Sequence, residues 1–353
     1  MKLLHVVGTR PNLPKLAPVY RAARARGLEQ VVVHTGQHYD DSLSGDFFRD
    51  LDIPTPDVNL AVGSASHAVQ TARIMERFEP VLLEHAPDWL VVYGDVNSTM
   101  AASVVASKLG VRVAHVEAGL RSFDRAMPEE INRLITDRLA DLLLTPSRDA
   151  DEQLLREGEP ASKIMFVGNV MIDSLYFALP SAEATGFRAS LGLTGPYVAV
   201  TLHRPSNVDH PERLTRIANA LAAIAKSRDV IFTAHPRTQE RIARYGIDLG
   251  NVRVIDPVPY FQMLDLVKNA ESVVTDSGGL QEETTALGVP CFTVRDNTER
   301  PITITEGTNQ LVLDPDTLRT LVPNVVRGPE LRRPDGWDGH AAERVVDALE
   351  LRA

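Results

Sequence analysis

One segment of the sequence reads Val111-Arg112-Val113-Ala114-His115-Val116-Glu117-Ala118-Gly119-Leu120-Arg121 and carries the clearest signal of a parallel α/β sheet. Residues 111–116 form a short, β-branched, apolar run that follows a helix-like segment and its terminating Gly110. The run predicts a buried parallel strand, and Glu117 follows its carboxyl end. Open α/β sheets place ligand-binding side chains at that edge, so we expect a functional role for Glu117, although it could also cap a turn.

A predicted helix begins at Pro128 and carries Glu129 and Glu130 in its first turn, with Arg133 one turn further along. The helix macrodipole stabilises carboxylates at this position whether or not they take part in chemistry. Glu129 and Arg133 have the spacing of neighbours on a helix surface, so they could also form an ion pair there. Taken alone, Glu129 is better explained by these structural roles than by catalysis.

A second acidic residue follows the apolar strand expected at residues 89–93. The chain continues there with Gly94-Asp95 before an alanine-rich helical run, so Asp95 and Glu117 lie at the same edge of the sheet. Asp95 could be an N-cap, a role worth about 1 kcal/mol. Two like charges on neighbouring strand ends, however, raise the pKa of one of them, which is how a base and an acid are obtained at one pH. Asp95 and Glu117 together therefore favour acid/base chemistry over purely structural roles.

Three strand ends carry glycine-rich or basic turns. The strand at residues 272–275 leads into Asp276-Ser277-Gly278-Gly279 and a helix, whose first N–H groups form a phosphate site that the glycines make accessible. Gly8-Thr9-Arg10-Pro11 ends the first strand, and Thr201-Leu202-His203-Arg204-Pro205 ends another. Together these turns predict a ligand with more than one phosphate.

The length of 353 residues suggests two domains, and strands alternate with helices in both halves. This alternation predicts parallel sheets with helices on both faces. The expected strands lie near residues 2–7, 30–35, 89–93, 111–116, 141–145 and 164–167, and then near 197–202, 230–234, 252–255, 272–275, 291–294 and 311–313. Residues 339–351 form an amphipathic helix pattern after a turn.

The composition is that of a water-soluble enzyme. The net charge of -10 argues against nucleic acid as a partner and provides no basic face for a membrane surface. The single cysteine, Cys291, allows no disulfide within the chain and is most simply a core thiol. Because no apolar run is long enough to cross a bilayer and the chain starts directly in a strand without a leader, we expect a cytoplasmic location.

The motifs resemble, nearly end to end, those of the non-hydrolysing UDP-N-acetylglucosamine 2-epimerases. The matching segments, in the family's order, are Gly8-Thr9-Arg10-Pro11, Thr35-Gly36-Gln37-His38, Gly94-Asp95, residues 115–121, residues 127–133, Val167-Gly168-Asn169, His203-Arg204, His235-Pro236-Arg237, residues 276–283 and Thr298-Glu299-Arg300-Pro301.

The resemblance implies two Rossmann-like domains whose parallel sheets face one another across a cleft, the arrangement called GT-B. Residues 1–168 would form the domain with the catalytic carboxylates, and residues 169–338 the domain that binds UDP. The last helix, residues 339–353, would pack back on the first domain. A homodimer is implied, and neither a membrane nor a nucleic acid is an expected partner.

The resemblance also implies the site residues. The catalytic residues would be Asp95, Glu117, Glu129 and His203. The residues that bind the UDP-amino sugar would be Arg10 and Lys15 near the diphosphate, Arg133 near the sugar, Ser277, Gly278 and Gly279 at phosphate oxygens, Glu283 at the ribose hydroxyls, and Arg300 at the sugar or phosphate. Lys15 and Arg300 could instead be solvated surface charges. No metal and no cofactor are expected.

The chemistry explains why carboxylates are needed. C2 of the sugar has no adjacent carbonyl, so its inversion cannot use an enolate, and no dinucleotide-binding fingerprint supports oxidation by NAD. The remaining route removes the C2 proton as UDP leaves C1 and then returns both to a 2-acetamidoglucal. The alternatives are a C2 epimerase of a related diacetamido uronic acid and a GT-B glycosyltransferase. Arg10-Pro11 and Arg300-Pro301 favour UDP-N-acetylglucosamine, and three carboxylates favour epimerisation, because an inverting transferase needs one base.

Two departures from the family pattern carry expectations of their own. Asn12 replaces a glutamate, which we expect to remove a carboxylate near the entrance of the site. Gln37-His38 is followed by Tyr39-Asp40, where many bacterial members have a basic residue and then a polar or acidic one. Asp40 would bring negative charge towards any second, activating diphosphate, so the sequence predicts that the allosteric substrate site is absent.

Overall fold

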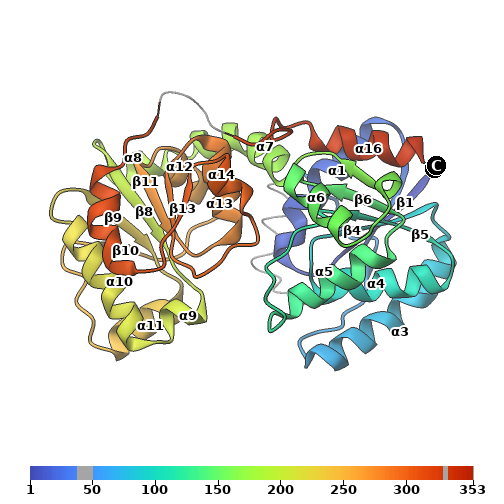
Figure 1. Ribbon diagram of the computed structural model, residues 1–353, viewed down its shortest axis with the longest axis horizontal. Coiled ribbons are helices and arrows are strands. Elements are labelled where there is room, and N and C mark those ends of the chain that lie inside the picture. The colour runs from blue at the N-terminus through green and yellow to red at the C-terminus, as the bar shows by residue number, and fades with distance from the viewer. Residues whose placement is uncertain (38–50, 329–332, 353) are drawn as a thin grey trace. The chain divides into compact units, whose positions relative to one another are not determined.

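The computed structural model describes residues 1–37, 51–328 and 333–352. The chain divides into two compact units, Met1–Phe177 with Asp335–Ala353, and Ala178–Pro334 (Figure 1). The first division lies inside helix α7 (Val170–Ala184), whereas the sequence interpretation put it at residue 168. The first half of α7 belongs to unit 1 because its buried side chains pack there, and the Ser174 hydroxyl donates a hydrogen bond to the carbonyl of Pro14.

Unit 1 contains a fully parallel sheet with the strand order β3-β2-β1-β4-β5-β6-β7. The strands are β1 (Lys2–Val7), β2 (Glu29–His34), β3 (Val58–Asn59), β4 (Trp89–Tyr93), β5 (Arg112–Val116), β6 (Leu142–Thr145) and β7 (Ile164–Phe166). The chain winds outward in opposite directions from β1 and from β4. The carboxyl ends of these two strands therefore form the topological switch point at which open α/β sheets bind ligands.

Helices cover both faces of this sheet. They are α1 (Leu13–Ala25), α3 (His67–His85), α4 (Asn97–Lys108), α5 (Pro128–Leu139), α6 (Arg148–Arg156), the first half of α7, and α16 (Ala341–Leu351), with short 3-10 turns η1 (Arg10–Asn12) and η2 (Ala161–Lys163). Helices α1 and α16 pack together on one face, and α3, α4 and α5 cover the other (Figure 1). The central strands are buried between these layers, which explains their continuous apolar sequences.

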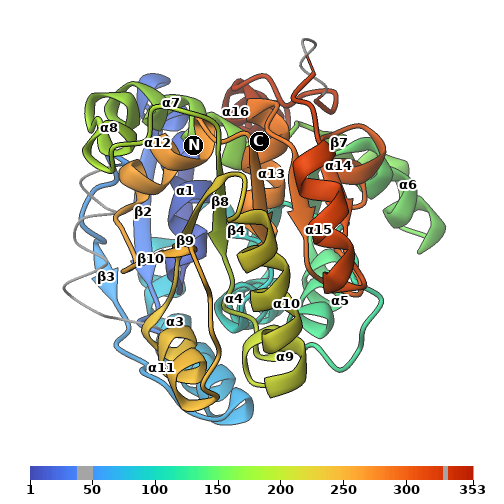
Figure 2. The same cartoon turned by 90° about the vertical axis from the view of Figure 1, so that its left-hand side faces the viewer.

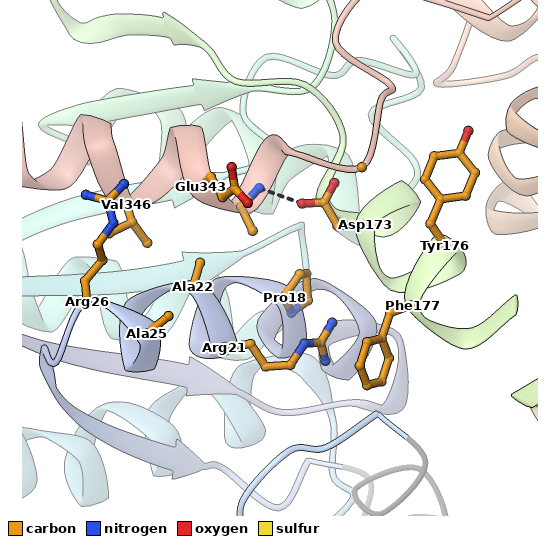
Figure 3. Close-up of a pocket in the computed structure, with 12 residues that line it drawn as sticks. Pro18, Arg21, Ala22, Ala25, Arg26, Asp173, Tyr176, Phe177, Glu343 and Val346 are labelled. Carbon is orange, nitrogen blue, oxygen red and sulfur yellow. Dashed lines mark hydrogen bonds between the residues drawn. The ribbon is translucent and has the colours of Figure 1, made fainter. Parts of the chain in front are cut away.

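Helix α16 is attached to unit 1 by hydrogen bonds to a carboxylate of helix α7. The Asp173 carboxylate of α7 accepts hydrogen bonds from the N–H groups of Ala341 (3.1 Å) and Ala342 (2.7 Å), as Figure 3 shows for one of them. These are N–H groups of the first turn, which have no partner inside the helix. Helices α1, α7 and α16 line a cavity of about 480 Å³, where the guanidinium of Arg21 stacks 3.8 Å from the ring of Phe177.

Unit 2 contains a second parallel sheet, with the order β10-β9-β8-β11-β12-β13. Its strands are β8 (Tyr197–Thr201), β9 (Asp229–Thr233), β10 (Arg253–Ile255), β11 (Ser272–Thr275), β12 (Cys291–Thr293) and β13 (Asn309–Leu311). Its helices are α8 (Phe187–Ser190), α9 (Pro205–Val208), α10 (Pro211–Ile224), α11 (Pro236–Arg244), α12 (Tyr260–Lys268), α13 (Gly278–Leu287), α14 (Ile302–Thr305) and α15 (Leu318–Leu321), with η3 (Pro315–Thr317) and η4 (Val322–Asn324).

Alternate side chains of β8 face two separate cores. Val198 and Val200 pack with α10 and α15, which lie side by side (Figure 2). Tyr197 and Ala199 point the other way, into a core with residues of α8, α12 and α13. This sheet has its switch point at the carboxyl ends of β8 and β11.

The two parallel-sheet α/β units confirm the predicted fold class, and the predicted strands agree with the observed ones to within a few residues. Strand β3 was not predicted, because two residues at a sheet edge leave no periodic pattern to detect. The last strand lies at Asn309–Leu311 rather than at residues 311–313. In the part of the chain that the structure describes, no helix is long and apolar enough to cross a membrane.

Candidate active site

Glu117 is held in a strained backbone conformation at the end of β5. Its φ is 74°, in the left-handed region that costs a non-glycine residue on the order of 1–3 kcal/mol. The residue is 7% exposed, and its carboxylate pairs with the Lys15 ammonium of α1. A Cβ on Gly94 would lie 2.7 Å from Lys15 Nζ and 3.1 Å from Glu117 Oε2, so a larger residue here would force the Lys15 ammonium to shift.

Lys15 is therefore not a solvated surface charge, the alternative that the sequence left open. The residue is 7% exposed. A buried ion pair of this kind is stabilising only while both partners are present, because removal of one leaves an uncompensated charge. The close approach of Gly94 to Glu117 also shows that the ends of β4 and β5 adjoin in space.

Asp95 follows Gly94 and is held by two residues of α5. Its Oδ2 accepts hydrogen bonds from Arg133 Nε (3.0 Å) and Nη2 (2.7 Å), and its backbone carbonyl accepts one from Asn132 Nδ2 (2.9 Å). The N-cap of α4 is Val96, so Asp95 is not the helix cap that the sequence allowed. Its side chain is 28% exposed, which leaves it accessible to a ligand.

The two adjacent glutamates of α5 have different surroundings. The Glu130 carboxylate is buried and accepts hydrogen bonds from the Ser122 backbone (2.9 Å) and hydroxyl, from the Phe123 backbone (3.0 Å) and from Arg133 (2.6 Å). Burial alone would raise the pKa of Glu130, but these donors outweigh it and hold the pKa below its ordinary value. Glu129 is half-buried and, among the residues described, makes no side-chain hydrogen bond or ion pair.

The surface ion pair that the spacing of Glu129 and Arg133 allowed does not form, because Arg133 binds Asp95 and Glu130 instead. Glu130 thus anchors the loop after β5, a role that the sequence interpretation did not assign. Glu129 is left at the start of α5 with its carboxylate available for proton transfer.

Arg10 lies in η1, directly after β1, and is exposed. Asn12 anchors this turn: its Oδ1 accepts from the N–H groups of Gly8 and Thr9 (both 3.2 Å), and its Nδ2 donates to the carbonyl of Tyr93 (3.0 Å). The expectation that Asn12 stands near the entrance is wrong, since it is 2% exposed. A glutamate could accept from the turn but could not donate to Tyr93, so Asn12 ties the ends of β1 and β4 together.

Gln37 lies beside this edge of the sheet, where its Oε1 accepts a hydrogen bond from the Ser98 hydroxyl (2.9 Å). Ser98 also exchanges a hydrogen bond with Thr35 (2.8 Å). His38, Tyr39 and Asp40, on which the expectation about an activating ligand rests, lie outside the described residues. That expectation therefore remains a prediction.

In unit 2, a buried aspartate organises the turn that carries His203. Asp276, directly after β11, is fully buried and accepts hydrogen bonds from the backbone N–H groups of His203 and Arg204 and from Asn207 Nδ2 (3.0 Å). It also pairs with His203 Nδ1 at 3.1 Å, while the His203 side chain is 52% exposed. Burial would raise the pKa of Asp276, but the contacts with His203 and Asn207 lower it overall.

The N-terminus of α13 presents backbone N–H groups next to an arginine. Ser277 is the N-cap, and no side-chain hydrogen bond caps the helix. A Cβ on Gly278 would lie 2.9 Å from Arg300 Nη1, whereas a Cβ on Gly279 would meet nothing within 4 Å. Gly278 thus packs against Arg300, and Gly279 faces open space at the helix N-terminus.

Arg300 is largely buried and not a solvated surface charge. Its guanidinium pairs with Glu299 Oε1 at 2.6 Å and with Glu282 Oε1 at 3.0 Å. Glu299 also pairs with Arg295 at 2.9 Å. Burial would raise the pKa of Glu299, but Arg300 and Arg295 outweigh burial and hold it well below its ordinary value. Glu299 therefore fixes the orientation of Arg300 beside the helix N-terminus.

Glu283 lies on α13 and is 7% exposed. Its Oε1 accepts a hydrogen bond from the Tyr260 hydroxyl at 3.1 Å. Burial, aided by the nearby charge of Glu282 and opposed by the bond from Tyr260, raises the pKa of Glu283 to about 7. A carboxyl group in this state can be ionised by a ligand that brings further hydrogen-bond donors.

The candidate residues thus fall into two groups, one in each unit. The group in unit 1 contains Arg10, Lys15, Asp95, Glu117, Glu129 and Arg133, and ion pairs join Lys15 to Glu117 and Arg133 to Asp95. The group at the switch point of unit 2 contains His203, Ser277, Gly278, Gly279, Glu283 and Arg300. The described residues of neither unit gather the three or more His, Cys, Asp or Glu side chains needed to hold a metal ion.

Four supporting residues had no role in the sequence interpretation: Glu130, Tyr260, Asp276 and Glu299. Only Asp276 had a usable signal, because it follows β11 directly and β11 neighbours β8, the strand that leads to His203. Tyr260 lies far from Glu283 in sequence, and Glu130 and Glu299 resemble ordinary surface acids until their partners are known.

Comparison with known proteins identifies the family of this chain. A family model described as UDP-N-acetylglucosamine 2-epimerase matches residues 21–350. The chain is 42% identical over 362 residues to the UDP-N-acetylglucosamine 2-epimerase of Methanocaldococcus jannaschii, with 99% of both proteins covered. It is 44% identical over 317 residues to the UDP-2,3-diacetamido-2,3-dideoxy-D-glucuronate 2-epimerase of Pseudomonas aeruginosa, with 88% of both covered.

The solved structures give the same result. The crystal structure of the Methanocaldococcus jannaschii UDP-GlcNAc 2-epimerase in complex with UDP-GlcNAc and UDP has a TM-score of 0.87 and 41% identity to this chain, and covers 99% of this chain and 100% of that one. The likeness supports the assignment of two parallel-sheet domains of the GT-B type. The family match and the identity over the full length show that this chain belongs to the UDP-N-acetylglucosamine 2-epimerase family of isomerases.

Proposed function

We propose that this enzyme interconverts UDP-N-acetylglucosamine and UDP-N-acetylmannosamine by elimination and re-addition of UDP. A base removes the proton from C2 while the bond between C1 and the UDP oxygen breaks, and the C2–H electron pair forms the C1=C2 bond of a 2-acetamidoglucal. UDP then adds back to C1 as an acid delivers a proton to the opposite face of C2. The reaction needs proton-transfer groups and a firm hold on the departing diphosphate.

One observation carries the proposal: Asp95 and Glu117 lie at adjoining strand ends of unit 1 with different partners, and α5, which carries Glu129, holds Asp95 through Arg133. Glu117 pairs with Lys15, Asp95 with Arg133, and Glu129 with no described side chain. Elimination and re-addition need a base on one face of C2 and an acid on the other, so more than one carboxyl group is needed. We assign proton transfer to Asp95, Glu117 and Glu129, and contact with the sugar to Arg133.

We assign the UDP moiety mainly to unit 2. The open N-terminus of α13 would bind phosphate oxygens through Ser277, Gly278 and Gly279, with Arg300 beside them. Glu283 would accept hydrogen bonds from the ribose hydroxyls. His203, half-exposed and oriented by Asp276, would act at the diphosphate, where the leaving oxygen needs a hydrogen-bond donor. Arg10 of unit 1 would contact the same diphosphate.

A second substrate deserves a direct comparison, because the Pseudomonas aeruginosa relative is named for a diacetamido glucuronate and is 44% identical. Purified enzyme should be assayed with UDP-N-acetylglucosamine and with UDP-2,3-diacetamido-2,3-dideoxy-D-glucuronate under the same conditions. We expect a higher kcat/KM with UDP-N-acetylglucosamine. A higher kcat/KM with the diacetamido glucuronate would change the assigned substrate but not the proposed reaction class.

The mechanism is tested by incubating the enzyme with UDP-N-acetylglucosamine in deuterated water and following C2 by proton NMR. We expect the C2 proton signal to disappear as the manno epimer forms, because the proton removed from C2 exchanges with solvent. Retention of that proton through many turnovers would rule out the elimination. Activity should persist in EDTA, since the proposed donors to the diphosphate are side chains and backbone N–H groups.

A further inference from the structure

Helix α5 buries a polar face instead of an apolar one. Its buried residues are Glu130, Asn132, Arg133, Thr136 and Asp137. Burial of such groups costs free energy unless each is hydrogen-bonded or paired. The contacts of Glu130 and Arg133 lead to the loop after β5 and to Asp95, and Asn132 donates to the carbonyl of Asp95 and to Asn97 of α4. Asp137, one turn beyond Arg133, has no role in the proposed chemistry and contacts three residues, His115, Gly119 and Arg121.

Asp137 joins β5 to the loop that follows Glu117. It is 2% exposed, and its Oδ1 lies 2.6 Å from His115 Nδ1. Its Oδ2 accepts hydrogen bonds from the backbone N–H of Gly119 (3.2 Å) and pairs with Arg121 Nη1 (2.7 Å). Burial would raise the pKa of Asp137, but His115 and Arg121 lower it overall. One carboxylate thus fixes the backbone immediately after Glu117.

His115 connects Asp137 to the end of the neighbouring strand, β4. It is completely buried, and its Nε2 lies 2.7 Å from the carbonyl oxygen of Gly94. A carbonyl oxygen can only accept, so Nε2 carries a hydrogen and donates it. Gly94 immediately precedes Asp95. The His115 ring therefore connects Asp137 to the turn that presents Asp95.

At the other end of this chain of contacts, Arg121 binds a second acidic residue, Glu157. Arg121 donates to Glu157 of unit 1 through Nε (2.9 Å) and Nη2 (2.6 Å), a two-point contact that fixes the guanidinium plane. The chain of contacts runs from Glu157 through Arg121, Asp137 and His115 to Gly94. All of its internal members are buried, so water does not compete for these hydrogen bonds.

We propose that Asp137 and His115 are positioning residues that hold Asp95 and Glu117 in register at the ends of β4 and β5. The spacing on α5 supports this: Arg133 and Asp137 are one helical turn apart, so one rigid helix contacts the Asp95 side chain and the His115 ring. Glu117 has a strained φ of 74°, which persists only where the surrounding contacts dictate it. The inference rests on the proposed roles of Asp95 and Glu117 in proton transfer.

The test compares Asp137→Asn with Glu159→Gln. Both remove one buried carboxylate that is paired with an arginine, but the partner of Glu159 is Arg138 of the same helix, whose side chain is 71% exposed. We expect Asp137→Asn to lower kcat by roughly 10²-fold, the loss associated with misplacement by about 1 Å, while KM stays near the wild-type value. Glu159→Gln should keep wild-type kcat. Turnover is measured per folded enzyme, with folding checked by thermal melting and circular dichroism.

A purely structural role would give a different result. Asp137→Asn would then lower the melting temperature, but kcat of the folded enzyme would stay at the wild-type value, and the proposal would be overturned. Equal losses in kcat for the two variants would overturn it as well. Wild-type turnover in the same series tests the proposed function separately.

A second measurement does not depend on activity. In ¹⁵N-histidine-labelled wild-type enzyme, the ring N–H of His115 should exchange slowly with solvent because the bond to Gly94 is buried. In Asp137→Asn the ring loses its carboxylate partner, and we expect that N–H signal to exchange fast or disappear. An unchanged His115 ring signal in Asp137→Asn would show that Asp137 does not orient the ring, and would overturn the proposal even if the enzyme acts on another substrate.

Discussion

At the scale of single residues, the site depends on carboxylates that look alike in sequence and differ in their partners. Glu129 and Glu130 are adjacent, yet Glu130 accepts hydrogen bonds from Ser122, Phe123 and Arg133, whereas Glu129 has no described side-chain partner. The donors around Glu130 hold its pKa below the ordinary value, and we expect it to hold the loop after β5 in place. Glu129 has none of these donors, and we expect it to act on the substrate.

This contrast predicts opposite outcomes for two neighbouring substitutions. Glu129→Gln should lower kcat by roughly 10²-fold or more and leave the melting temperature unchanged, as expected when an acid/base group is removed. Glu130→Gln should lower the melting temperature, because the amide offers Arg133 and the loop after β5 only one acceptor oxygen and no negative charge. Steady-state kinetics and thermal melting of the two variants separate the roles. Near-normal turnover in Glu129→Gln would remove it from the mechanism.

Glu283 predicts a pH dependence of nucleotide binding. Burial raises its pKa to about 7, so in the free enzyme it ionises only as the pH passes that value. Its protonated form is favoured in the fold, and the corresponding stability is lost as the pH rises through about 7. If the ribose hydroxyls donate to the ionised carboxylate, affinity for the nucleotide should increase with pH over the same range.

The measurement uses UDP-N-acetylglucosamine and calorimetry in a Glu117→Gln background, which prevents turnover. The affinity should rise with pH and level off above about 7. Adding Glu283→Gln should weaken binding and abolish this rise, since the amide does not titrate. A rise that survives Glu283→Gln would assign the titration to another group, and the ribose contact would lose its support.

At the scale of elements, function lies at helix N-termini and strand ends that the sheets bring together. Helix α13 begins beside Arg300, with the first-turn N–H groups of two glycines available. The two glycines differ in what surrounds them, since a Cβ meets Arg300 at Gly278 and open space at Gly279. They therefore form a matched pair for testing whether Arg300 and the helix N-terminus act together.

We expect Gly278→Ala to weaken UDP binding because its methyl group displaces the Arg300 guanidinium from the helix N-terminus. Gly279→Ala introduces the same methyl group where no protein atom lies within 4 Å, so it leaves Arg300 in place and affects binding only through contact with the ligand itself. Calorimetric titration with UDP measures both. If Gly278→Ala binds UDP as tightly as wild type, Arg300 does not contribute to the phosphate site.

At the scale of the whole molecule, the sequence departs from many bacterial relatives at a point that bears on regulation. Tyr39-Asp40-Asp41 follows Gln37-His38, and the two aspartates add negative charge to a segment where a second diphosphate would need positive charge. Like charge nearby weakens anion binding. We therefore expect the enzyme to work without a second substrate molecule as activator.

The prediction is that the reverse reaction from pure UDP-N-acetylmannosamine starts without a lag and that saturation curves are hyperbolic. Progress curves with and without a trace of UDP-N-acetylglucosamine provide the comparison. A lag that the trace abolishes, or sigmoidal forward kinetics, would show that an activating site exists despite Asp40. The variant Asp40→Lys should then reveal whether charge at this position changes the response.

The sequence by itself determined the fold class and most of the strands. Apolar runs such as residues 111–116 and 272–275 are local signals, and burial in a parallel sheet needs nothing more than such a run between two helices. The same reasoning located Glu117 and Asp95 correctly at one sheet edge, because strand ends in a parallel sheet lie together. It failed for β3, whose two residues carry no pattern, and for the position of Asn12, which looks like an exposed turn residue.

Tertiary structure alone decided which side chains are partners. Lys15 and Glu117 are separated by 102 residues, and His203 and Asp276 by 73, so neither pair follows from local spacing. Their contacts result from the order in which the strands are arranged, with β1 beside β4 and β8 beside β11. That order is fixed by the packing of whole helices against the sheets. The chemistry of each residue is local, but the surroundings that give adjacent carboxylates such as Glu129 and Glu130 different roles are created only when distant segments pack together.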